Sequence, residues 1–276
     1  TELLQVALGY NLEDGAPTVP AEALAPDLDC TLPPLVSGVV RLRLFHDAMR
    51  TLEGQMLRDV RAVVKRRLQE LIATQTVAKT ATHGSDSIHD RPSGSSVAAP
   101  ASAEPIDAAK PAQRTLMAHV RDLSVDEFQR AMGRVSTSLL VLIRRAALIH
   151  ATIANTLTTS AGRAAVASAA ETEDCERYAA AVTQRGASML ARTCELAQER
   201  YMRLLKVRKE QHIRHRLADF VRISRGAREF LRDVDHLCPG QALSTLDAEL
   251  DAHACEFLRH KHTEAEQKLV ATLEIE

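Results

Sequence analysis

The sequence contains no tryptophan, and aromatic residues make up only 3% of its 276 positions. Stacking on aromatic side chains is a main way in which proteins hold single-stranded nucleic acid. The 35 Lys and Arg residues are balanced by 36 Asp and Glu residues, so the net charge of -1 gives no general attraction to polyanions. We therefore expect no nucleic acid among the partners of this chain.

The five cysteines are odd in number and irregularly placed, unlike the cysteines of a disulfide framework. This pattern favours a reducing, cytosolic setting. The longest apolar run, Leu139 to Ile143, is far shorter than the roughly 20 residues that span a bilayer, so the sequence predicts no transmembrane helix. Because the chain starts at Thr1 and ends within a helical pattern at Glu276, we expect it to be a piece of a longer protein.

The common motifs of nucleotide, zinc and hydrolase chemistry are also missing: the sequence has no Walker loop and no GxGxxG, HExxH, GxSxG or CxxC pattern. We expect no enzymatic activity, no catalytic residue and no cofactor. His253, Cys255, His260 and His262 are of the metal-ligating type, but His253 to His260 and Cys255 to His262 are steps of seven. Helical ligands normally share a face at steps of three or four, so we expect no metal site.

Prolines divide the chain. Five lie between Pro17 and Pro34 and four between Pro92 and Pro111, whereas residues 112–238 have none. That long stretch is rich in strong helix formers, and no sustained alternation typical of strands occurs anywhere. The predicted fold class is all-α, with long antiparallel helices in an extended, rod-like bundle of the kind found in tethers.

Five regions follow from composition and from apolar spacing at three- and four-residue steps. They are an irregular Pro-containing segment over 1–34, a helical hairpin or one bent helix over 35–74, a disordered linker over 75–114, a helical bundle region over 115–243, and the start of a truncated C-terminal helical domain over 244–276.

Within the bundle region, Ser124 and Glu127 form a capping-box pattern that predicts a helix running to about Thr156. A break is expected between 157 and 171 around Gly162, followed by helices over 173–213 and 217–237. The last helix is expected to start at Ser244.

The helix over 173–213 carries a stripe with heptad-like spacing, which is typical of a seam for another helix. The sequence leaves open whether that partner helix lies in the same chain. The predicted seam consists of Leu190, Cys194, Ala197, Tyr201 and Leu204.

The densest positive charge lies just beyond this seam, within 200–216. The favoured interpretation is a solvated helix face paired with Glu195, Glu199 and Glu210. The alternative is a peripheral membrane-binding module that engages anionic lipid. The basic residues are Arg200, Arg203, Lys206, Arg208, Lys209, Arg214 and Arg216.

Several features follow one another in a recognisable order. They are a Leu-Leu-x-x-Arg unit (Leu204, Leu205 and Arg208), a Leu-x-x-Phe helix start (Leu217 and Phe220), the pair Glu229 and Phe230, a turn at Gly240, and a helix carrying Ala254, Phe257, Leu258 and a charged face over 260–266. With the pieces LPPLVSGVVRLRLFHDAM and VRDLSVDEFQRAM, the chain resembles the vacuolar protein sorting-associated protein 54 family over most of residues 32–276. It departs from that family in lacking a Gly or Pro break near residues 43–46.

That family provides a subunit of the Golgi-associated retrograde protein (GARP) tethering complex. The resemblance implies a non-enzymatic role in capturing endosome-derived vesicles, at the cytosolic face of the trans-Golgi network. It implies the other tether subunits as partners, together with SNARE proteins bound through regions outside this sequence. An anionic membrane surface is a further expected partner under the alternative interpretation of the basic stretch.

Overall fold

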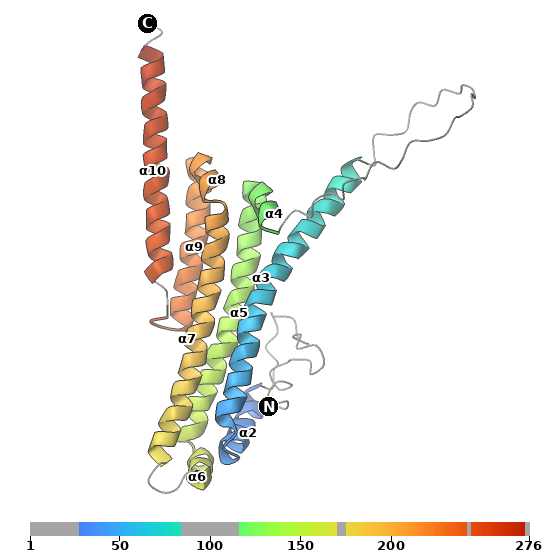
Figure 1. Ribbon diagram of the computed structural model, residues 1–276, viewed down its shortest axis with the longest axis vertical. Helices are drawn as coiled ribbons and strands as arrows, with labels where there is room; N and C mark the ends of the chain where they lie inside the picture. Colours follow the sequence, from blue (N-terminus) through green and yellow to red (C-terminus); the bar gives the residue numbers. More distant parts are fainter. Residues whose placement is uncertain (1–27, 84–115, 170–174, 242–243, 274–276) are drawn as a thin grey trace, which may run out of the picture.

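The computed structural model describes residues 28–83, 116–169, 175–241 and 244–273, and every regular element in these ranges is an α-helix (Figure 1). The helices pack antiparallel, which confirms the all-α prediction. They are α2 (Leu28–Arg41), α3 (Phe45–His83), α4 (Leu116–Asp122), α5 (Val125–Thr158), α6 (Ser160–Ala169), α7 (Cys175–Val207), α8 (Lys209–Arg214), α9 (Leu217–Leu237) and α10 (Ser244–Leu273).

The centre of the molecule is α5, which packs against α3, α7 and α9. It starts where the sequence predicts, because the Ser124 hydroxyl accepts from the Glu127 amide while the Glu127 carboxylate accepts from the Ser124 amide. By length and composition alone α5 could cross a membrane. In the bundle, however, its apolar stripe is buried against three neighbouring helices, as expected for the core helix of a helical protein.

Residues 35–74 form a helical hairpin rather than one bent helix, and its turn contains neither Gly nor Pro. The turn between α2 and α3 is a Schellman arrangement, with Arg43 at a φ of 57°. The Leu44 amide donates to the Val39 carbonyl and the Arg43 amide to the Val40 carbonyl, at 3.1 and 3.0 Å. These bonds hold an arginine where glycine is usual, so the missing Gly did not prevent the break.

Two predicted boundaries were wrong. The helix α2 begins at Leu28, inside the segment predicted to be irregular, and it includes Pro33 and Pro34. Burial of Leu32 and Val36 on either side of these prolines offsets the donors that they lack. The helix α3 continues to His83 rather than ending at 74. Residues 1–27 and 84–114, which hold the rest of the predicted irregular segment and linker, lie outside the described residues.

The predicted break near Gly162 is a sharp corner between α5 and α6. The Thr159 side chain accepts from the Gly162 amide at 3.0 Å and so caps the new helix. A Cβ atom at Gly162 would lie 1.9 Å from the carbonyl oxygen of Thr156, so this corner requires glycine. The stretch 157–171 therefore contains a short helix beyond its break, which the sequence had not indicated.

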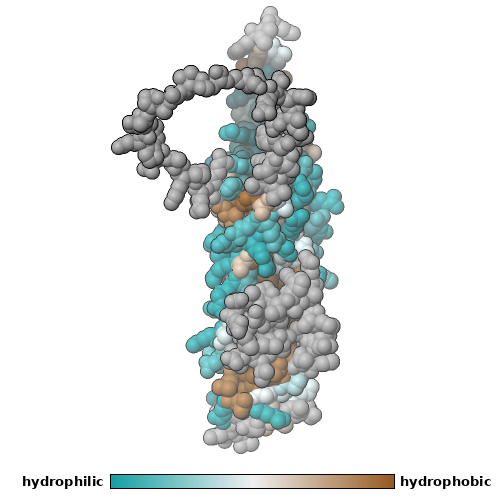
Figure 2. Space-filling model, turned by 90° about the vertical axis from the view of Figure 1, so that its right-hand side faces the viewer, coloured by the Kyte–Doolittle hydropathy of each residue, from teal (hydrophilic) through white to brown (hydrophobic). Residues whose placement is uncertain are grey.

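Apolar side chains form two clusters along the rod. One includes Phe128, Tyr201 and Phe230 and lies toward α4, α8 and α9. The other includes Met49 and Ile153 and lies toward α2 and α6. On the side of the rod that carries α3, the described surface is largely hydrophilic, with apolar residues in separate patches (Figure 2).

Candidate functional site

The predicted seam is buried inside this chain. Cys194, Ala197, Tyr201 and Leu204 belong to the larger cluster, and Leu190 is partly buried against both clusters. The Tyr201 ring stacks on Phe230 of α9 with their centroids 4.4 Å apart. The question that the sequence left open is thus answered: the helices that cover this seam belong to the same chain.

The basic stretch 200–216 does not form one continuous surface, because the chain breaks at Arg208 between α7 and α8. Arg208 is 3% exposed, and its guanidinium lies 4.8 Å from the centre of the Phe128 ring. It donates to the Ser124 carbonyl and to the Gln211 side chain. Burial lowers the pKa of the Arg208 guanidinium. Arg208 therefore holds the α5 start against the α7–α8 corner rather than facing a ligand.

Two further cations of the stretch are neutralised by α10. Lys206 pairs with Glu249 at 3.0 Å and Lys209 with Glu256 at 2.7 Å. Of the three carboxylates expected as partners, Glu199 lies 3.9 Å from Arg203. The sequence could not indicate the α10 carboxylates, because they lie more than 40 residues further along the chain.

The remaining basic residues differ in exposure. Arg200 is half-buried, and burial together with the nearby Arg203 lowers the pKa of its guanidinium. Arg203, Arg214 and Arg216 are exposed, and Arg214 and Arg216 stand on either side of His215 at the α8–α9 corner. The exposed positive charge that the stretch offers is therefore reduced to a few arginines.

A cluster of histidine and phenylalanine rings lies beneath this corner, and sequence reasoning did not find it. The His212 ring contacts Phe128, His215 and His253, with centroids 5.2 to 5.7 Å apart. His253 in turn meets Phe220 edge-on, and Phe220 stacks on Phe257. These contacts join α8, α9 and α10 to the start of α5.

His212 is fully buried, and neither of its ring nitrogens makes a hydrogen bond within the described part of the chain. Burial, aided by His253 and Arg208, lowers the pKa of His212 to about 3. Burial also lowers the pKa of His253 and of His215. These histidines are therefore neutral at physiological pH and act as packing groups. No group of three or more metal-ligating side chains in the described ranges is arranged to hold an ion.

The residue spacing contained a signal for these buried polar groups. Arg208 follows Leu204 by four residues, and His212 follows Arg208 by four, so in the sequence both keep the spacing of the buried stripe of α7. In α10, His253 stands between Leu250 and Phe257 at helical steps. A polar residue at a stripe position is the sequence sign of a buried polar contact.

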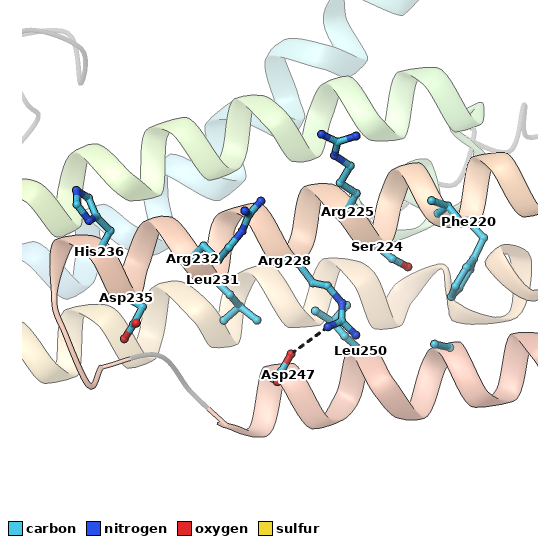
Figure 3. Close-up of a pocket in the computed structure, with 12 residues that line it drawn as sticks. Phe220, Ser224, Arg225, Arg228, Leu231, Arg232, Asp235, His236, Asp247 and Leu250 are labelled. Atoms are coloured by element: carbon cyan, nitrogen blue, oxygen red, sulfur yellow. Dashed lines mark ion pairs between the residues drawn. The ribbon is translucent and has the colours of Figure 1, made fainter.

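Beside this cluster, an open groove of about 930 Å³ lies between α9 and α10 (Figure 3). Its floor is apolar and contains Leu231 and Leu250, with Phe220 at one end. One wall carries arginines of α9 and the other carries Asp247 of α10. In the close-up, Arg228 reaches across from α9 toward Asp247, whereas Arg225 is directed away from α10.

A groove with this lining offers an apolar floor edged by charged side chains. Comparison with known proteins adds no assignment: no family model, no curated protein and no solved structure matches the chain.

Proposed function

We propose that this chain is a non-enzymatic subunit of a vesicle-tethering complex for retrograde transport from endosomes to the trans-Golgi network. It would act on the cytosolic face of that compartment. The proposal rests on the projection of α10, which continues well beyond the ends of its neighbouring helices (Figure 1). Its far half leaves Leu269, Val270 and Leu273 between 54% and 70% exposed.

Exposed leucines and a valine on a projecting helix support a role in helix assembly, because such side chains gain about 25 cal/mol for each Å² that a partner covers. The resemblance of the residue order to that of the vacuolar protein sorting-associated protein 54 family supports the tether assignment and implies the expected partners. These are the other subunits of the retrograde tether, with SNARE proteins bound through regions outside this sequence.

The test is affinity purification of the tagged full-length protein from its own cells. Recovery of the other retrograde-tether subunits is expected, and Leu269→Asp should reduce it several-fold. Gln267→Asp, two residues away on the other side of α10, is the matched control and should leave recovery unchanged. Recovery of no tether subunit, or of the subunits of another tether, would contradict the proposal.

The second candidate function is binding to an anionic membrane surface, and it is favoured by the exposed arginines at the α8–α9 corner. Sedimentation with vesicles containing phosphatidylserine tests it. If the corner binds lipid, sedimentation should require the acidic lipid, weaken with salt and fall in Arg214→Glu combined with Arg216→Glu. Absence of binding at low salt would eliminate this function.

A further inference from the structure

The groove between α9 and α10 is open because the two helices meet at few points. At one end the Phe220 and Phe257 rings stack with centroids 4.1 Å apart. Nearer the other end, Arg228 pairs with Asp251 at 2.5 Å and lies 3.9 Å from Asp247. The groove lies between and beside these contacts, and its floor residues Leu231 and Leu250 are 8% and 5% exposed.

The apolar surface of the groove continues onto its rim. Val221 lines the groove and is 52% exposed, and Ala254 faces the same space from α10. The α9 residues that line the groove extend from Phe220 to His236, a length of about 24 Å at 1.5 Å per residue. That length matches about four turns of a helix laid along the groove.

The α9 wall is mainly basic, with Asp235 as its one lining carboxylate, and the α10 wall is acidic. Arg225, Arg228 and Arg232 lie on α9 at steps of three and four, and all three side chains are at least half exposed. On α10, Asp247 lines the groove and Asp251 lies beside it, at 57% and 63% exposure, and both face Arg228. An apolar floor between a basic and an acidic edge is the arrangement that selects partner and orientation in helix–helix recognition.

We propose that this groove binds an amphipathic helix of a partner protein, with acidic residues along the flank that faces α9 and basic residues along the flank that faces α10. The identification of that partner as another tether subunit rests on the proposed function above. The helix would place apolar residues at steps of three and four over Leu231 and Leu250 and against Val221. Its acidic flank would meet Arg225 and Arg232, whose only ion pairs in the described structure are with Glu229 of their own helix.

The test is a selection of displayed 21-residue amphipathic peptides, with apolar positions fixed and flank positions randomised, against the immobilised full chain. Selected peptides should be acidic on one flank and basic on the other. Val221→Asp should weaken their binding at least tenfold. Ala218→Asp, an exposed α9 position that does not line the groove, should not.

A charge-reversal variant makes the test specific. Arg225→Glu combined with Arg232→Glu should weaken the selected peptide at least tenfold, and replacing the acidic flank of that peptide with lysines should restore binding. Thermal melts of all variants test whether they remain folded. Because every substituted side chain is exposed, we expect only small changes in melting temperature.

Several outcomes would overturn the inference. They are failure to enrich any peptide, binding that Val221→Asp leaves unchanged, and a flank preference that the double reversal does not invert. Self-association of the chain that Val221→Asp abolishes would also overturn it, because a second copy would then be the occupant. The selection uses synthetic peptides and the isolated chain, so its failure is distinguishable from a failure to recover tether subunits from cells.

Discussion

At the scale of single residues, the corner between α7, α8 and α10 is built from polar side chains used as packing groups. Arg208 lies over Phe128, and His212 lies among Phe128, His215 and His253. A buried cation beside a ring that is kept neutral is a stable combination only while the ring stays unprotonated. The stability of this corner therefore depends on its hydrogen bonds and on pH.

The first prediction concerns Arg208. Replacing it with alanine removes a buried stem, the ring contact and the donor to the Ser124 carbonyl, so Arg208→Ala should cost about 2 kcal/mol of unfolding free energy. Arg208→Met, which keeps the stem, should cost less. Arg214→Ala is the exposed control and should change stability by less than about 0.5 kcal/mol. Equal losses for Arg208→Ala and Arg214→Ala in urea titrations would contradict the buried role of Arg208.

The second prediction concerns pH. The pKa of His212 is about 3 in the folded chain and about 6.5 in the unfolded chain. Between these values the unfolded chain binds a proton that the folded chain does not, so stability falls as the pH decreases below 6.5. From pH 7 to pH 5, His212 alone should cost about 2 kcal/mol.

Urea unfolding of the unmodified chain and of His212→Leu at both pH values measures this contribution. The variant should lose less stability than the unmodified chain on acidification. His260→Leu, which removes an exposed histidine of α10, is the control. An identical pH dependence for the chain with and without His212 would show that its ring is not the linked group.

At the scale of elements, helix ends decide where the chain turns. Gly162 makes the α5–α6 corner because a Cβ atom there would overlap the Thr156 carbonyl. The third prediction is that Gly162→Ala destabilises the chain by at least about 2 kcal/mol. Gly133→Ala, within α5 and with no atom near the added methyl group, should instead stabilise it by about 0.5 to 1 kcal/mol. Thermal melts measure both changes in stability. A Gly162→Ala variant as stable as the unmodified chain would show that the corner can relax.

The helices that were predicted well are those with a clear sequence signal at one of their ends. The capping box at Ser124 and the Pro-Gly pair after Cys238 gave α5 and α9 nearly their observed bounds. The α2–α3 turn lacked such a signal, because its bonds come from backbone groups that any residue carries. The groove could not be predicted either, since it depends on the angle between α9 and α10 rather than on the pattern of either helix.

At the scale of the whole molecule, the far half of α10 extends away from the packed bundle. The fourth prediction is that a chain ending after Thr263 melts within about 2 °C of the full chain, because the removed side chains that the structure describes are largely exposed. Its helical circular dichroism should fall in proportion to the residues removed. A large drop in melting temperature would show that this half is packed against something in solution, such as a second chain.

The two apolar clusters are crossed by the same three helices. Met56 and Val60 of α3, Ile143 and Ala146 of α5, and Met189 and Cys194 of α7 stand on either side of the boundary between them. One end of the rod cannot swing relative to the other without bending all three helices at once. We therefore expect the α2–α6 end and the α8–α10 end to move together as one stiff body.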